Sequence, residues 1–130
     1  MARFCLFLLT AFFYGVAVGQ GASPEINAPY RNPNYEQWRQ RFETEGREVY
    51  DQRHAIVAAA LLRPGMAVAD IGAGSGLFTR LFAAEVGKAG RVYAVDIARA
   101  FLEGNLRRAR AEGHQNVLAI ESTQEDTRLA

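Results

Sequence analysis

The sequence predicts an α/β fold built on parallel β-strands, and three observations lead to this prediction. Short apolar runs alternate with amphipathic helical patterns between residues 66 and 120. The first two apolar runs each end at an acidic residue, Asp70 and Asp96. A turn with three alternating glycines separates the first run from the helix that follows it. A strand, a glycine turn and a helix in this order are typical of a nucleotide-binding βαβ unit.

The expected elements begin at Tyr35, where Tyr35, Trp38 and Phe42 fall on one face of a helical pattern. A second helical pattern follows Gly46 and continues to Leu61. The remaining elements are predicted as strands over 66–71, 91–96 and 117–120, and as helices over 77–86 and 99–112. Right-handed crossover connections place the three strands side by side in the order 3-2-1.

The glycine turn allows a ligand to lie against bare backbone N–H groups at the start of a helix. An acid at the end of the second strand, here Asp96, is the usual partner of ribose hydroxyls. The dinucleotide pattern G-x-G-x-x-G requires glycine or alanine at position 77, and Leu77 stands there instead. A nucleoside site is therefore expected, with a pyrophosphate ligand the weaker alternative.

An acid two residues before G-x-G-x-G resembles the nucleotide-binding motif of class I S-adenosylmethionine-dependent methyltransferases. The run from Phe42 to Asp96, which includes FETEGREVYD and RPGMAVADIGAGSG, is similar to a group of bacterial exported or envelope-associated methyltransferase-domain proteins. The resemblance implies S-adenosyl-L-methionine as cofactor and a Rossmann-like three-layer sandwich. Only the first half of the family's seven-stranded sheet, preceded by N-terminal helices, is expected within this sequence.

The resemblance also assigns cofactor-binding residues by position. The methionyl part is expected beside the glycine turn, formed by Asp70, Gly72, Ala73, Gly74 and Gly76. Ribose is expected on Asp96 and the adenine face on Ile97. One adenine hydrogen bond is expected on Thr123, with Glu125 or Asp126 as the alternative. In the family the residues that orient the methyl acceptor follow strand four, so neither a catalytic residue nor an acceptor is predicted here. His54 and His114 stand apart without companion ligands, so no metal site is expected.

The N-terminal segment reads as a secretory signal peptide over residues 1–19, with Arg3 before an apolar stretch and small residues at a cleavage site. The stretch is short for a membrane span, so export to the bacterial periplasm or envelope is predicted, with a membrane anchor if cleavage does not occur. Residues 20–34 contain three prolines and are expected to form an extended leader. A partial methyltransferase domain, truncated at its C-terminal side, is expected over 35–130.

Charge does not point to a nucleic-acid partner, because 15 basic residues nearly balance 14 acidic ones. The two N-terminal helical patterns nevertheless carry a dense polar set. This set has two interpretations, a solvated helix face with i,i+4 ion pairs or a surface that closes over the ligand. Its members are Arg39, Glu43, Arg47, Asp51, Arg53 and His54.

Two alternatives to an S-adenosylmethionine-dependent methyltransferase remain open. A nicotinamide-dependent oxidoreductase would use the same strand, glycine turn, helix and Asp96. A non-catalytic binding domain would keep the fold without the chemistry. As a fragment, the isolated chain is expected to be catalytically inactive.

Overall fold

The structure is a computed structural model that describes residues 24–129, and the predicted signal peptide, 1–19, lies outside these residues. Its centre is a parallel sheet of three strands, β1 (Ala67–Ile71), β2 (Arg91–Asp96) and β3 (Val117–Glu121). β2 lies between the other two strands. The predicted α/β class and the strand order 3-2-1 are therefore confirmed.

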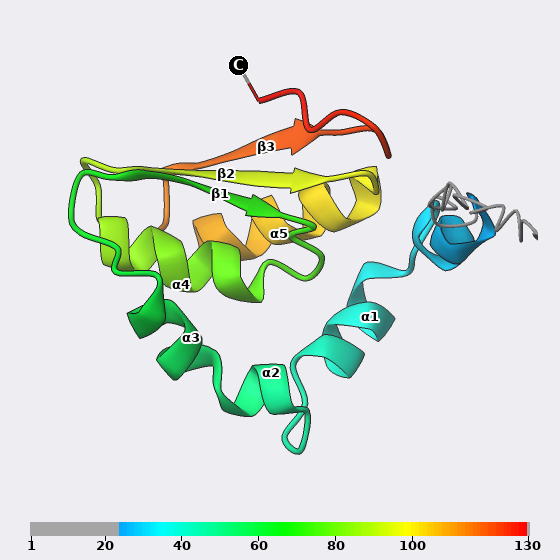
Figure 1. Cartoon of the computed structure of the whole chain (residues 1–130), viewed down its shortest axis with the longest axis horizontal. Helices are drawn as coiled ribbons and strands as arrows, with labels where there is room; N and C mark the ends of the chain where they lie inside the picture. The colour runs from blue at the N-terminus through cyan, green and yellow to red at the C-terminus, as the bar shows by residue number, and fades with distance from the viewer. Residues whose placement is uncertain (1–23, 130) are drawn as a thin grey trace, which may run out of the picture.

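Two helices, α4 (Leu77–Val86) and α5 (Arg99–Ala111), pack against the same face of the sheet (Figure 1). The core lies between this face and the helices, and burial of its apolar side chains stabilises the fold by about 25 cal/mol per Å². Its buried members include Ala83, Val86, Val92, Ala94, Leu102, Ala109 and Val117. Residues 24–129 thus provide the sheet and one helix layer of the predicted sandwich.

The opposite face of the sheet carries apolar side chains that remain open to solvent. Side chains alternate along a strand, and Val68 of β1 and Val117 of β3 face the core, so Ile71 and Leu118 point to this second face. Ile71 is 63% exposed and Leu118 is 42% exposed. Within the described residues β1 pairs only with β2, so its other edge is free.

Three α-helices precede β1 in the described part of the chain, namely α1 (Tyr35–Phe42), α2 (Glu48–Asp51) and α3 (Arg53–Ala59). They lie on the outer side of the helix layer, with α1 against α5 and α3 against α4 (Figure 1). Asn34 caps α1, since its side-chain oxygen accepts the Gln37 N–H at 3.0 Å.

Two sequence predictions for this N-terminal part were wrong in detail. The single helix expected after Gly46 is interrupted at Gln52, where the Arg53 guanidinium donates to the Tyr50 carbonyl at 2.7 Å and occupies a helical acceptor. The part of the leader expected to be extended is a 3-10 helix over Pro24–Tyr30. Tyr30 packs on Trp38, with ring centroids 4.9 Å apart, which anchors this segment to α1. No helix in the described part of the chain is long and apolar enough to cross a membrane.

Candidate cofactor site

A cavity of about 480 Å³ opens at the carboxyl ends of the strands. In parallel α/β sheets this edge is where ligands bind, and the volume is in the range of small-molecule sites. The cavity wall is formed by the ends of β1 and β2, the glycine turn, the segment after β3 and aromatic residues of the N-terminal part.

Asp96 lines this cavity and is only 7% exposed. One carboxylate oxygen accepts the Gly74 N–H at 2.8 Å, and the other accepts the Ala98 N–H at 2.9 Å. These two bonds join the end of β2 to the glycine turn and to the start of α5. Each carboxylate oxygen can accept more than one hydrogen bond, so Asp96 keeps acceptor capacity for hydroxyl groups in the cavity.

Asp70 is the penultimate residue of β1 and accepts a hydrogen bond from the Thr79 hydroxyl at 2.6 Å. Burial raises the pKa of the Asp70 carboxyl above its ordinary value, and the negative charge of Asp96 raises it further, although the bonds from Thr79 act in the opposite direction. The Thr79 hydroxyl in turn accepts from the Asn105 amide at 2.9 Å, so α4 and α5 both hold the Asp70 side chain in place.

The glycines of the turn have different surroundings. Gly72 and Gly74 line the 480 Å³ cavity, and both have positive φ. Gly76 does not line it, and a Cβ added there would lie 2.2 Å from the Asn105 side chain. Absence of a side chain at Gly76 is therefore required by the packing of α5 against the turn rather than by a ligand.

The other predicted site residues also divide between the cavity and the core. Ile97 and Thr123 line the cavity with Asp96. Ala73 is 8% exposed and packs in the hydrophobic core, and its N–H donates to the Val95 carbonyl at 3.0 Å. It also lines a smaller cavity beside the first one. The Thr123 hydroxyl oxygen accepts the Asp126 N–H at 2.9 Å, which folds the segment after β3 into a tight turn beside the cavity.

Aromatic residues of the cavity wall were not predicted from the sequence as site residues. Tyr30, Phe42 and Phe101 line the cavity, and the ring centroids of Phe42 and Phe101 are 6.2 Å apart. The Phe42 ring would lie 3.2 Å from a Cβ at Gly74, so it closes one side of the turn. The helical spacing of Tyr35, Trp38 and Phe42 indicated packing, and no signal in the sequence showed that this packing borders a cavity.

A smaller cavity of about 190 Å³ adjoins the first and shares Phe42, Gly72 and Gly74 with it. Asp70 and Arg47 line this second cavity. The Arg47 guanidinium lies 5.2 Å from the Phe42 ring centroid and donates to the Phe42 carbonyl at 3.1 Å. A negative and a positive side chain thus border the same space, which suits a ligand that carries both an ammonium and a carboxylate.

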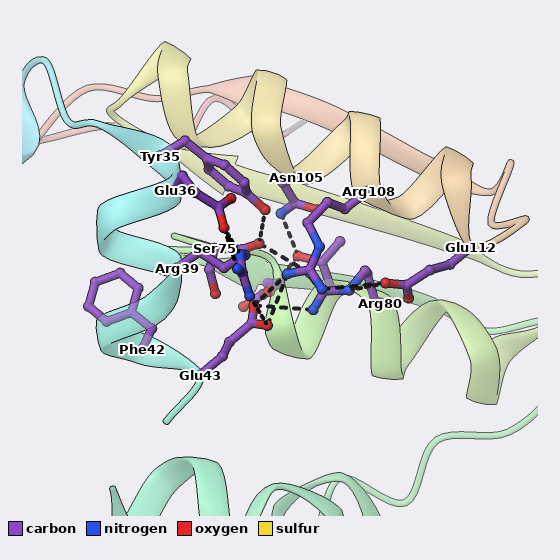
Figure 2. Close-up of polar contacts among 12 residues, drawn as sticks. Tyr35, Glu36, Arg39, Phe42, Glu43, Ser75, Arg80, Asn105, Arg108 and Glu112 are labelled. Carbon is purple, nitrogen blue, oxygen red and sulfur yellow. Dashed lines mark hydrogen bonds and ion pairs between the residues drawn. The ribbon is translucent and has the colours of Figure 1, made fainter. Parts of the chain in front are cut away.

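The polar set of the N-terminal helices is not uniformly solvated. Asp51 and His54 are exposed, as a solvated face requires. Glu43 is different, because its side chain is 7% exposed and contacts Arg80 of α4 and Arg108 of α5 (Figure 2). Among residues 24–129 no group of three His, Cys, Asp or Glu side chains is placed to hold a metal ion.

Comparison with known proteins agrees with this geometry. Residues 68–130 match a family model described as a methyltransferase domain. No curated protein matches the chain.

Two solved structures are similar to this chain. One is a SAM-dependent methyltransferase from Aquifex aeolicus, with 25% sequence identity and a TM-score of 0.59 over 69% of this chain and 48% of that protein. The other, a candidate rRNA methylase from Clostridium thermocellum, is 23% identical with a TM-score of 0.53 over 62% of this chain and 44% of that protein, and supports the fold alone. The chain therefore spans about half the length of these proteins. Residues 68–130 are thus similar to a methyltransferase domain, and the comparisons indicate S-adenosylmethionine as the cofactor.

Proposed function

We propose that the chain contains the cofactor-binding half of an S-adenosylmethionine-dependent methyltransferase. The observation that carries this proposal is the position of Asp96, a buried strand-end carboxylate with spare acceptor capacity at a cavity bordered by Gly72 and Gly74. Ribose hydroxyls would donate to Asp96, and adenine would lie between Ile97 and the segment after β3. In the adjoining cavity, Asp70 would accept from the cofactor's ammonium group and Arg47 would donate to its carboxylate.

When bound, S-adenosylmethionine supplies an electrophilic methyl group on a sulfonium. The residues of this chain would contribute by holding the cofactor in one orientation, and such positioning supplies much of the rate acceleration in displacement reactions. The chain would also exclude water on one side of the cofactor through Tyr30, Phe42 and Phe101.

We further propose that the acceptor is bound by residues other than those described here, and that the chain alone does not transfer methyl groups. Two observations support this. The chain spans 48% of the Aquifex aeolicus enzyme. The face of the sheet opposite α4 and α5 also leaves Ile71 63% exposed and Leu118 42% exposed, which is typical of a surface that packs against further structure.

Export to the periplasm or envelope is a separate proposal, supported by the apolar N-terminal segment with Arg3 and a small-residue cleavage site. Cell fractionation of a tagged protein, with mass spectrometry of its N-terminus, tests it. Cleavage near residue 19 is the expected result. An intact N-terminus on a cytoplasmic protein would contradict the proposal.

The proposed cofactor is tested by isothermal titration of the purified chain with S-adenosylmethionine, S-adenosylhomocysteine and NAD. We expect both sulfur compounds to bind with one-to-one stoichiometry, and NAD to bind at least about tenfold more weakly, because Leu77 replaces the small residue of the pyrophosphate motif. Preferential NAD binding would favour the oxidoreductase alternative. Cofactor binding by a full-length protein that methylates no acceptor would favour the non-catalytic binding domain.

Substitution of Asp70 by asparagine is expected to weaken S-adenosylmethionine binding about tenfold, because the cofactor's ammonium group loses a charged acceptor. The same substitution is expected to raise the Tm at neutral pH. Its side-chain oxygen can still accept from Thr79, whereas the partly buried charge is removed. Since the pKa of Asp70 is raised in the folded state, its ionisation disfavours folding.

The free-energy cost of ionising Asp70 in the folded state is absent below the ordinary carboxyl pKa of 3.8. It develops as the pH rises through the higher pKa of the folded state. The Tm difference between the Asp70→Asn variant and the parent chain should therefore be near zero at about pH 3.5 and positive at about pH 7. Differential scanning fluorimetry at both values measures it. A variant less stable than the parent at neutral pH would show that the Asp70 charge is compensated in the fold.

A further inference from the structure

Glu43 joins the end of α1 to the two helices that cover the sheet. It follows the last residue of α1 and caps the helix, and its carboxylate lies between α4 and α5 (Figure 2). One oxygen is 3.1 Å from Arg80 Nη2, and the other is 2.9 Å from Arg108 Nη1. Glu43 and Arg80 side chains are each 7% exposed, so this ion pair is buried.

Docking of α1 brings the negative charge of Glu43 to the positive charges of Arg80 and Arg108. Glu112 also contacts Arg80, with 3.1 Å between Nε and Oε1, and lies 3.6 Å from Arg108. Glu112 comes from the end of α5 and its side chain is 44% exposed, so it remains hydrated. Glu43 is therefore the buried counter-charge of Arg80, and removal of one partner of a buried ion pair is strongly unfavourable.

The same short helix forms part of the cofactor cavity. Phe42 lines the cavity beside Gly74, and Tyr35 at the start of α1 donates its hydroxyl to the Ser75 carbonyl at 2.8 Å. Helix α1 thus contacts the glycine turn at both of its ends. A Cβ at Gly104 would lie 2.2 Å from the Tyr35 ring, so α5 has room for α1 only because this position is glycine.

Helix α1 depends on these contacts for its position. It has eight residues, and none of them is buried. A helix of this length is marginal in isolation, so its docking rests on the aromatic contacts on one side and on Glu43 on the other.

We propose that Glu43 is a positioning residue that keeps α1 docked, and that cofactor affinity depends on this docking. The identity of the ligand in this inference rests on the proposed function, whereas the docking of α1 does not. If α1 is undocked in part of the molecules, the wall formed by Phe42 is lost from that fraction, and the apparent Kd rises in inverse proportion to the docked fraction.

The chain contains a reporter for this docking, because Trp38 on α1 is its one tryptophan. Its ring centroid lies 6.5 Å from that of Phe101 on α5, with the two rings edge to face. This contact is lost when α1 separates from α5, and the Trp38 ring then moves to a more aqueous surrounding. Substitution Glu43→Gln keeps the shape of the side chain and removes its charge. We expect a red shift of Trp38 emission, and an apparent Kd for S-adenosylhomocysteine about tenfold higher, which corresponds to α1 docked in about one molecule in ten.

Two variants distinguish the loss of α1 docking from a general loss of stability. Glu112→Gln removes the other carboxylate of the cluster without touching α1, and should leave Trp38 emission and affinity as in the parent chain. Gly104→Ala displaces the Tyr35 ring, leaves all charges in place and adds a better helix former to α5. It should reproduce the red shift and the loss of affinity, so the test does not depend on Glu43→Gln folding normally. Far-UV circular dichroism monitors the α/β core in each variant.

The inference is overturned if Glu43→Gln keeps the parental Trp38 emission and affinity. It is also overturned if Gly104→Ala shifts the emission without weakening the binding of S-adenosylhomocysteine. An equal red shift in Glu112→Gln would also overturn it, because the effect would then belong to the whole charge cluster. Failure of the parent chain to bind S-adenosylhomocysteine would refute the proposed function instead. The Trp38 emission of the ligand-free variants would still decide whether Glu43 holds α1.

Discussion

The Asp96→Asn variant is expected to lose S-adenosylmethionine affinity by about a hundredfold or more. Asparagine has one acceptor oxygen, whereas Asp96 uses two, for the N–H groups of Gly74 and Ala98. The amide NH₂ would face one of these donors and leave that buried N–H without a partner, at a cost of about 1–3 kcal/mol. The glycine turn would shift, and the charged acceptor for the ribose hydroxyls would be lost as well.

Titration of both chains with S-adenosylhomocysteine measures this effect. Glu121→Gln provides a matched control, because Glu121 ends the next strand, β3, but is exposed and does not line the cavity. We expect the control to bind as the parent chain does. Asp96→Asn binding with parental affinity would place the ribose elsewhere and remove the main support for the proposed site.

Among the substitutions considered, Gly76→Ala is expected to lower the free energy of unfolding most, by about 3 kcal/mol or more. Gly76 has φ +79°, and its Cβ would lie 2.2–2.5 Å from three atoms of the Asn105 amide group. Asn105 is fully buried and bonded to Thr79, so it has no free volume into which it can move. The variant must therefore separate α5 from the glycine turn or remain unfolded.

Gly113→Ala separates the steric effect from backbone strain. Gly113 has a similar φ of +86°, but no atom lies within 4 Å of a Cβ added there. The stability lost in Gly113→Ala is therefore limited to the cost of the left-handed backbone conformation, about 1–2 kcal/mol. Urea unfolding of both variants gives the comparison. Equal destabilisation at the two positions would show that contact between Gly76 and Asn105 does not limit stability.

Much of the α/β part follows from local sequence patterns. The bounds of α4 and β2 agree with the prediction, because each segment has one clear periodicity and ends at a glycine or an acid. The helical spacing of four apolar residues in α5 predicts that they face the core, and the structure agrees. Phe101, Leu102 and Ala109 are buried, and Leu106 is partly buried against the core. Here local preference and tertiary packing favour the same structure.

The arrangement of the N-terminal helices could not be predicted in the same way. Glu43 lies in a charged segment whose local pattern matches a solvated face, and its partners are Arg80 and Arg108, far along the chain. A charge pattern within one helix contains no information on partners supplied by other elements. One signal was present in the sequence, because Arg80 is a charged residue that shares the inward side of α4 with Ala83 and Val86.

The site shows the same division between local and long-range information. Asp96, Ile97 and the glycines at 72 and 74 line the cavity, and the sequence singles them out because each lies in a local pattern, either a strand that ends at an acid or a glycine turn. Phe42 and Tyr30 border the cavity only because α1 folds back over the glycine turn. The role of Gly76 depends on Asn105 of α5, a contact that the glycine motif itself does not reveal.

The contacts of α1 also determine the order in which the molecule can form. Arg108 is separated from Glu43 by 65 positions, and α1 docks against α5, with Arg80 of α4 paired to Glu43. This docking surface does not exist until both strand-helix units have assembled, and α1 is too short to be stable without it. During synthesis α1 therefore leaves the ribosome before its partners and docks after them. Early unfolding under mild denaturant should begin at the same helix, since the last element to gain its contacts is among the first to lose them.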